Sequence, residues 1–154
     1  MADWNQFEEE APVLANAIRE RIEAHKHLVL GTLRANGTPR LSGIEAFLIG
    51  ENLWIGSMPG TVKARDLIHD PRMSLHTAPL DITLSEGDAK ITGTAIEASM
   101  ETKEWFRDQV DVPPGPFHLF CIDIQEAAYV TLDGSQLVIS SWKPGRPTRQ
   151  VRRS

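Results

Sequence analysis

Tight-turn signals separate short apolar runs along much of this chain. Asn36-Gly37 follows the apolar run 28–33, and Asp133-Gly134 precedes the run 136–142. Asn-Gly and Asp-Gly favour a two-residue turn between neighbouring strands, because such a turn needs positive φ angles. Turns this short join antiparallel strands, whereas parallel strands need a long crossover. The chain is therefore expected to fold as a mainly antiparallel β structure.

The spacing of the turns predicts six or seven strands. The first three are expected at residues 28–33, 38–49 and 53–57, hydrogen-bonded in sequence order as a β-meander. The others are expected over residues 73–77, 90–98, 117–131 (as one or two strands) and 136–142.

Helical patterns interrupt the strands at three places. Apolar residues at helical spacing follow Pro12 and predict an N-terminal helix over residues 8–24. Shorter helices are expected at 62–69 and 100–110. Antiparallel strands with interspersed helices in 154 residues predict a single domain, a β-barrel at 28–142 with helices around it and a basic tail at 143–154.

The charge of the chain is unevenly distributed. Its 16 Lys and Arg against 21 Asp and Glu give a net charge of −5, which argues against a nucleic-acid-binding domain. The last twelve residues nevertheless contain five basic residues and no acidic one. No apolar run is long enough to cross a bilayer, and the start of the chain lacks the basic and apolar regions of a signal peptide. A cytoplasmic protein without membrane or nucleic-acid partners is expected.

Common catalytic patterns are missing from the sequence. There is no G-x-S-x-G elbow, P-loop or G-x-G-x-x-G motif. His25 and His27 lack further ligands at metal-binding spacing, and the single Cys121 lies in an apolar run typical of a buried, unreactive thiol. The sequence therefore predicts no metal and identifies no catalytic residue.

One segment has the composition of an anion site. A strand ends at Gly56-Ser57-Met58, a turn follows, and a helix begins at Thr61 with Lys63 in its first turn. Free backbone N–H groups, a hydroxyl and an ammonium group can converge on a phosphate there. A solvated lysine on an exposed helix explains the pattern equally well.

Two further places are candidates for ligand contact. In the second strand, Leu41-Ser42-Gly43 has small residues that let a flat ligand approach the backbone, although a β-bulge is the simpler explanation. Near the C-terminus, Trp142 offers a stacking plane and Arg149 a guanidinium group, although a core Trp and a solvated tail fit as well.

Taken together, these segments resemble the FMN-binding split-barrel family typified by pyridoxamine 5′-phosphate oxidase. The likeness is carried by five short segments in the same order as in the family: Leu30-Gly31-Thr32-Leu33, Asn36-Gly37-Thr38-Pro39, Leu53-Trp54-Ile55-Gly56-Ser57, Lys63-Ala64-Arg65-Asp66-Leu67 and Asp70-Pro71-Arg72-Met73-Ser74-Leu75.

The resemblance implies a six-stranded antiparallel split barrel that forms a homodimer with cofactor sites at the subunit interface. It assigns the cofactor phosphate to Thr61 and Lys63. It assigns the flavin ring and ribityl chain to Leu41, Ser42, Gly43, Gly56, Ser57 and Met58. Trp142 and Arg149 resemble a Trp and an Arg that reach the neighbouring subunit's site, with the spacing one residue different.

Three departures from the family pattern bear on the activity. Ser42 stands where the oxidase has an arginine that helps to bind FMN, and Thr61-Val62-Lys63 replaces Ser-Arg-Lys. Arg149-Gln150-Val151 replaces the Arg-Leu-His run that grips pyridoxal phosphate. Oxidation of vitamin B6 is therefore not expected.

The resemblance implies an oxidoreductase that moves a hydride through N5 of FMN, or of the deazaflavin F420, to or from a small molecule. F420 is an alternative because its polyglutamyl tail suits the C-terminal arginines. The other hypothesis is a non-catalytic split barrel that carries flavin or haem for sensing or storage. Turnover of the bound cofactor distinguishes these hypotheses.

Overall fold

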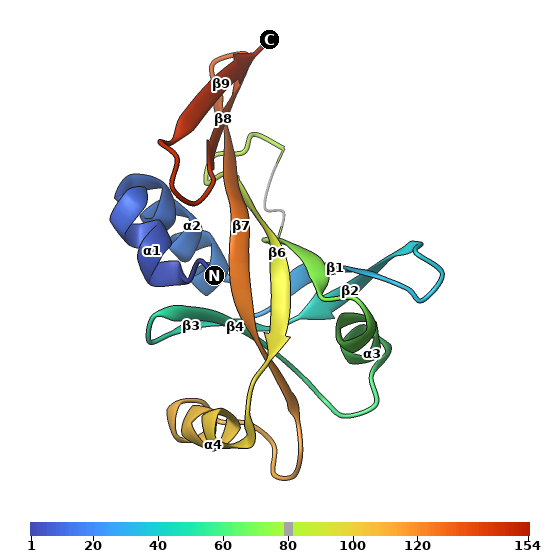
Figure 1. Ribbon diagram of the computed structural model, residues 1–154. Coiled ribbons are helices and arrows are strands. Elements are labelled where there is room, and N and C mark those ends of the chain that lie inside the picture. Colours follow the sequence, from blue (N-terminus) through green and yellow to red (C-terminus); the bar gives the residue numbers. More distant parts are fainter. Residues whose placement is uncertain (79–81) are drawn as a thin grey trace.

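The computed structural model describes residues 1–78 and 82–154, which form four helices and nine strands (Figure 1). The helices are α1 (Trp4–Glu10), α2 (Pro12–Ala24), α3 (Val62–His69) and α4 (Met100–Gln109). The strands are β1 (Leu28–Leu33), β2 (Pro39–Ile44), β3 (Ala46–Ile49), β4 (Asn52–Ser57), β5 (Arg72–His76), β6 (Asp88–Glu97), β7 (His118–Asp133), β8 (Gln136–Trp142) and β9 (Arg149–Arg153). The predicted mainly β, antiparallel fold is confirmed.

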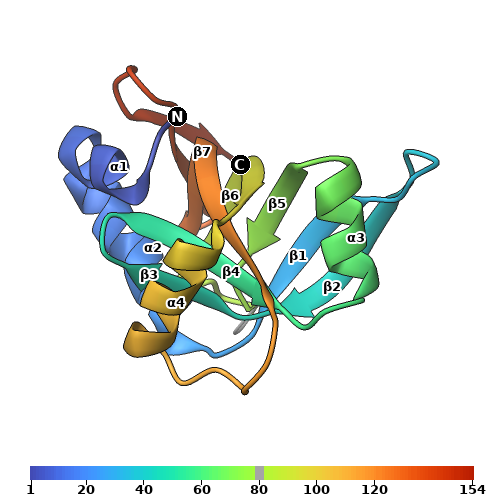
Figure 2. The same ribbon diagram turned by 60° about the horizontal axis from the view of Figure 1, so that its bottom comes forward.

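All strands belong to one curled antiparallel sheet. Its main path runs β2-β1-β5-β6-β7-β4-β3, and β8 and β9 extend it from the second half of β7. The sheet curls round without closing, since no ladder among the described residues joins β2 to β3 or β4 (Figure 2). The chain thus forms a split barrel, with three more strands than the six that the resemblance implied.

The long strand β7 connects the two halves of the sheet. It has 16 residues, and it pairs with β4 near its start, with β8 near its end and with β6 along most of its length. At Gly93 of β6 the register shifts, and a Cβ atom there would lie 2.0 Å from the backbone oxygen of Asp123. Only glycine permits this close approach of β6 to β7.

Both hairpins of the predicted β-meander are confirmed, but its middle strand is not continuous. The hairpin of β1 and β2 around Asn36-Gly37 is confirmed, but the expected strand 38–49 is broken at Glu45 into β2 and β3. The hairpin of β3 and β4 then lies at the other end of the sheet, because β4 pairs with β7. Apolar alternation shows that a segment is a strand, but it does not show which strand lies beside it.

The single helix expected at 8–24 is also divided. Ala11 has φ −144° and ψ 65°, outside the helical region, and it separates α1 from α2. Pro12 disfavours helical geometry at the residue before it, and it then serves as the first residue of α2. Asp3 caps α1 by accepting a hydrogen bond from the backbone N–H of Gln6 at 2.8 Å.

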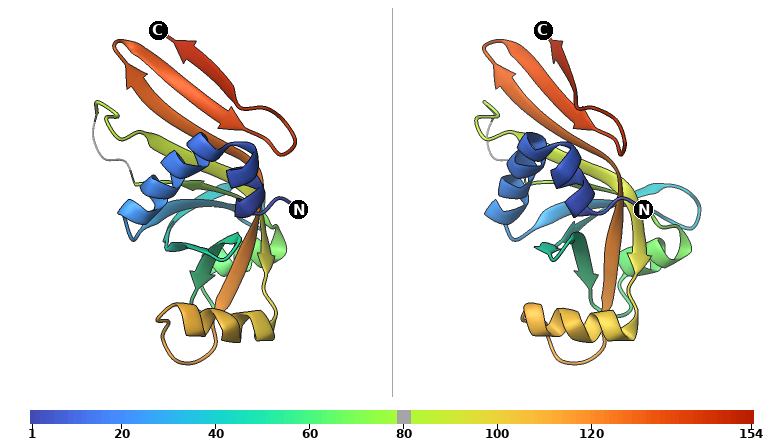
Figure 3. Two further views of the ribbon diagram at one scale, coloured as in Figure 1. Left: turned by 90° about the vertical axis from the view of Figure 1, so that its left-hand side faces the viewer. Right: turned by 60° about the vertical axis from the view of Figure 1, so that its left-hand side comes forward.

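Residues 143–154 are not a free tail. They contain a turn followed by β9, which pairs with β8 in register from Ser141–Arg149 to Leu137–Arg153. Figure 3 shows this hairpin continuing the upper end of β7. The five basic residues are therefore fixed on a strand and the loop before it.

The main core lies between the sheet and the α1–α2 pair. Its largest fully buried side chains include Trp4, Phe7, Ile18, Leu30 and Trp142. A second cluster around Trp54, Phe106 and Leu119 holds α4 against β4 and β7. Cys121 packs against that cluster, and its burial, together with the charges of Asp3 and Asp123, raises the pKa of its thiol to about 11. In the described part of the chain, no helix is both long and apolar enough to span a membrane.

Candidate functional site

The junction between β4 and α3 is built around two hydroxyl groups. Gly60 has φ +77°, which turns the chain after Ser57-Met58-Pro59 into the helix. Thr61 is the N-cap of α3, and its Oγ1 accepts a hydrogen bond from the backbone N–H of Ala64 at 3.3 Å. The hydroxyl of Ser57 lies 2.5 Å from that of Thr61. The predicted residues Ser57 and Thr61 are therefore in direct contact at the positive end of a helix.

Lys63 connects this junction to β2. Its Nζ donates a hydrogen bond to the backbone oxygen of Gly43 at 3.0 Å. Among the described residues, no carboxylate forms an ion pair with Lys63, so its positive charge is not neutralised by the protein. An ammonium group held in this way is available to an anion.

Strand β2 forms a free edge of the sheet, since β1 is its only pairing partner in the described part of the chain. The backbone oxygen of Gly43 faces that edge, and strand alternation gives the backbone groups of Leu41 the same direction. The side chain of Leu41 is 76% exposed. A Cβ atom placed on Gly43 would meet nothing within 4 Å, so the edge beside Lys63 is open.

The predicted small residues lie on different faces around this edge. Ser42 is half-buried and pairs with Leu30, whereas Leu41 and Gly43 face the other way. Leu41 lines a hollow of about 310 Å³ on the outer face of β1, β2, β5 and β6. Gly56 pairs with Leu119, and a Cβ atom there would make only an ordinary contact, 3.8 Å from the His118 oxygen.

Asp66 fixes α3 on the sheet, and the sequence analysis did not identify it as part of the site. Its carboxylate accepts hydrogen bonds at 2.7 Å from Thr32 Oγ1 on β1 and from Arg40 Nε on β2. Burial would raise the pKa of Asp66, but these bonds and the charges of Arg40 and Arg34 hold that pKa below its usual value. The pair orients the helix that carries Lys63.

Arg40 is the second residue that the sequence analysis missed. It lies two positions before Ser42, and alternate residues of a strand share a face. The spacing therefore placed an arginine on the same face as Ser42, although not at the position where the family pattern has it. Arg40, Arg34 and Arg65 line a hollow of about 340 Å³ beside the first turn of α3. The junction is thus more basic than Lys63 alone indicated.

The structure does not bring Trp142 and Arg149 to this junction. Trp142 is 1% exposed, and its ring stacks on Phe7 with the ring centroids 4.6 Å apart. Arg149 is exposed on β9 and lines a hollow of about 320 Å³ with Lys90 and Arg153. Both residues lie on the β8–β9 hairpin, away from α3 (Figure 1). Within one chain, eight of the ten predicted residues lie around β2, the end of β4 and the start of α3.

Comparison with known proteins supports the fold. The family model for pyridoxamine 5′-phosphate oxidase matches residues 14–152. No curated protein matches the chain.

Solved structures with the same fold include PhzG from Burkholderia lata 383 in complex with tetrahydrophenazine-1-carboxylic acid. It has 15% identity and a TM-score of 0.68, with 93% of this chain and 89% of that chain covered. A pyridoxamine 5′-phosphate oxidase-related, FMN-binding protein from Nostoc punctiforme has 14% identity and a TM-score of 0.62, with 100% and 98% covered. A heme-binding protein from Mycobacterium smegmatis has 21% identity and a TM-score of 0.62, with 83% of this chain and 58% of that chain covered.

Proposed function

Because the chain belongs to the pyridoxamine 5′-phosphate oxidase family, we propose that it binds FMN at the β4–α3 junction and is an oxidoreductase. The observation that carries the proposal is the ammonium group of Lys63, which has no acidic partner among the described residues and contacts the open edge of β2. Lys63 lies in the first turn of the helix whose N-terminus holds the hydroxyl groups of Ser57 and Thr61. This donor set fits a phosphate ester on a flexible chain.

Different residues of the junction would contact different parts of the cofactor. Thr61, Ser57 and Lys63 would hold the phosphate, with Arg65 adding positive potential, whereas the charge of Arg40 is paired with Asp66. The open edge at Leu41-Ser42-Gly43 and the chain at Gly56-Ser57-Met58 would lie along the ribityl chain and the ring. When bound, a flavin supplies hydride transfer at N5, and the protein contributes position and electrostatics.

A homodimer is part of the proposal. Arg149 lies away from Lys63 in its own chain, so the hairpin of a second subunit would have to bring a guanidinium group to the junction. The buried ring of Trp142 has no exposed face with which to stack on a cofactor, and it is left out of the proposed site. A cytoplasmic location stays a prediction.

F420 is the alternative cofactor, since it too has a phosphate on a ribityl chain. Its polyglutamyl tail would need free basic groups. Arg152 forms an ion pair with Asp133 at 2.7 Å, whereas Arg149 and Arg153 line one hollow with Lys90. The fixed position of β9 makes these charges a defined surface and not a mobile arm.

The test is titration of the purified protein with FMN, F420 and haem in turn, followed by visible absorption. We expect FMN to bind and Lys63→Ala to weaken the binding at least about tenfold, because it removes a charged hydrogen bond worth about 1.5–3 kcal/mol. Arg19→Ala is the control, since Arg19 lies on α2, away from α3 and outside the β8–β9 hairpin (Figure 1), and it should leave the affinity unchanged.

Two outcomes would contradict the proposal. If none of the three cofactors binds, or if Lys63→Ala binds FMN as tightly as the parent protein, the junction is not the cofactor site. If FMN does bind, addition of NAD(P)H to the loaded protein tests the activity. Bleaching of the flavin spectrum would support an oxidoreductase. Binding of flavin or haem without turnover would support a carrier or sensor instead.

A further inference from the structure

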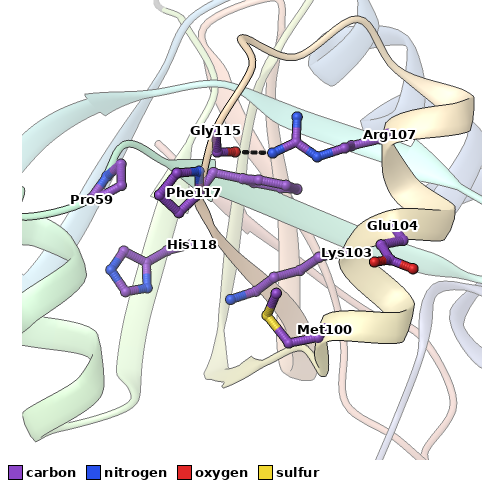
Figure 4. A pocket seen from close by; sticks show the side chains of 9 residues that line it. Pro59, Met100, Lys103, Glu104, Arg107, Gly115, Phe117 and His118 are labelled. Atoms are coloured by element: carbon purple, nitrogen blue, oxygen red, sulfur yellow. Dashed lines mark hydrogen bonds between the residues drawn. The ribbon is translucent and has the colours of Figure 1, made fainter.

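A second pocket lies on the other side of the β4–α3 turn, between α4 and the start of β7 (Figure 4). Its volume is about 450 Å³, within the range of small-molecule sites. Its walls include the apolar side chains of Pro59, Met100, Pro116 and Phe117. Met100 is 72% exposed, so the pocket opens to solvent along α4.

The pocket shares the turn with the proposed phosphate site. His118, which lines the pocket, is the register partner of Ser57 in the ladder between β4 and β7. Pro59, another lining residue, stands in the chain between Ser57 and Thr61. A molecule in the pocket would therefore be separated from the junction by one turn of backbone.

Two of the titratable residues that line the pocket, Lys103 and His118, are paired with Glu97. Glu97 Oε1 lies 3.1 Å from Lys103 Nζ and 2.8 Å from His118 Nδ1, so the charge of Lys103 is neutralised and the His118 ring is held in one orientation. The remaining nitrogen, Nε2, is not used by Glu97. Glu104, the acidic residue that lines the pocket, is exposed.

Arg107 differs from Lys103 and His118, because its hydrogen bonds go to neutral groups. Its guanidinium group lies over the Phe117 ring, 4.7 Å from the ring centroid. It donates hydrogen bonds to the backbone oxygens of Pro113, at 3.0 Å, and Gly115, and both acceptors are neutral (Figure 4). Among the described residues, no carboxylate forms an ion pair with Arg107. The pocket thus holds a fixed, un-neutralised cation against an aromatic wall.

We propose that this pocket binds a small, flat carboxylic acid. The apolar body would pack on Phe117 and Met100, and the carboxylate would lie on Arg107. His118, whose Nδ1 faces the Glu97 carboxylate, would accept a hydrogen bond from the ligand at Nε2.

The first test compares 1-naphthoate with 1-naphthamide, which has a similar shape and no charge. Isothermal titration calorimetry on the purified protein measures both without any need for flavin. We expect naphthoate to bind and the amide to bind at least about tenfold more weakly, the effect of losing one charged hydrogen bond. Equal affinities, or no binding of naphthoate, would overturn the proposal.

Two variants locate the binding. Arg107→Gln should reduce naphthoate affinity at least about tenfold and have little effect on the amide. Because Arg107 also anchors the loop at 113–115, a second variant, Met100→Trp, fills the pocket from an exposed position and leaves the charge in place. It should weaken both compounds. Arg146→Gln, on the exposed loop before β9, is the control, and unchanged naphthoate binding in both pocket variants would overturn the proposal.

A last measurement separates this inference from the proposed function. Both pocket variants should still bind FMN, because a turn of backbone separates the pocket from the junction. Loss of FMN binding in both variants would show that the pocket is not a separate site and would overturn the proposal. If FMN does not bind but naphthoate still depends on Arg107, the acid site stands and the proposed function fails.

Discussion

The β4–α3 junction and the β8–β9 hairpin have similar sequence signals but opposite environments. Each combines a turn with basic residues and with a side chain that is able to contact a ligand. That side chain is Thr61 at the junction and Trp142 at the hairpin. At the junction the hydroxyl and ammonium groups lie at the surface, and the nearby charge of Lys63 has no acidic partner. At the hairpin the Trp142 ring is buried against Phe7, whereas the basic side chains of the loop and of β9 face solvent.

The difference shows that the direction of a side chain decides between a binding role and a packing role. Trp142 is the last residue of β8, and its ring points into the core under α1. Lys63 lies in the first turn of a short helix and reaches across to a strand edge. The composition of the two segments does not contain this information.

The largest expected effect is a loss of stability when Trp142 of the β8–β9 hairpin is replaced. Trp142→Ala removes a fully buried ring, and it should lower the free energy of unfolding by about 3–5 kcal/mol. Trp105→Ala is the matched control, since the Trp105 side chain is 40% exposed, and it should cost much less. Urea unfolding measures both, and an equal cost would show that Trp142 is not a core residue.

The second prediction concerns the anchor of the junction. Asp66→Asn weakens the charged hydrogen bonds to Thr32 and Arg40, and it should lower the free energy of unfolding by about 1.5–3 kcal/mol. Asp70→Asn is the comparison, because the pair of Asp70 with Arg72 is exposed, and its effect should be smaller. If Asp70→Asn costs as much, the Asp66 contacts do not hold α3 in place.

The same carboxylate predicts a pH dependence. Its folded pKa lies below the usual value of 3.8, so it stabilises the fold at pH values above the unfolded pKa, and this contribution is lost as pH falls through the folded pKa. The difference in unfolding free energy between the parent protein and Asp66→Asn should be constant from about pH 7 to pH 5 and shrink below about pH 4. A difference that stays constant down to about pH 2 would contradict the assigned pKa direction.

The smallest effect on stability is expected at Arg149. Its side chain is exposed, so Arg149→Gln should change the free energy of unfolding by less than about 0.5 kcal/mol. In the proposed dimer, the same variant should weaken FMN binding, because the guanidinium group would act at the partner's junction. A large loss of stability would instead identify Arg149 as a structural residue of the hairpin.

The sequence predicted the type of most elements because turn residues and apolar periodicity are local. The Asn36-Gly37 hairpin, the Thr61 cap and the break after His69 are all local signals, and each is present in the structure. The pairing of β4 with β7 is different, since the two strands are far apart in sequence and no local pattern connects them. For this reason the sequence did not show that the two hairpins lie at opposite ends of the sheet.

The candidate site, like the fold, could be predicted where its residues are close together in sequence. Ser57, Thr61 and Lys63 lie within seven residues of each other, and the chain order alone indicated that they were neighbours. Arg40 and Asp66 come from different elements and meet only when α3 packs on β1 and β2. The burial of Trp142 depends on Phe7, which is distant in the chain.

The length of β7 has a consequence for the order in which the molecule can fold. Among the described residues, the β3–β4 hairpin joins the rest of the sheet only through β7, and β8 and β9 are built on the same strand. During synthesis, β4 must therefore wait for more than sixty later residues before it gains its second neighbour. Contacts of such long sequence separation slow folding, because a large loop has to be closed before they form. Until β7 docks, the edge of β4 is unpaired and open to association with other chains.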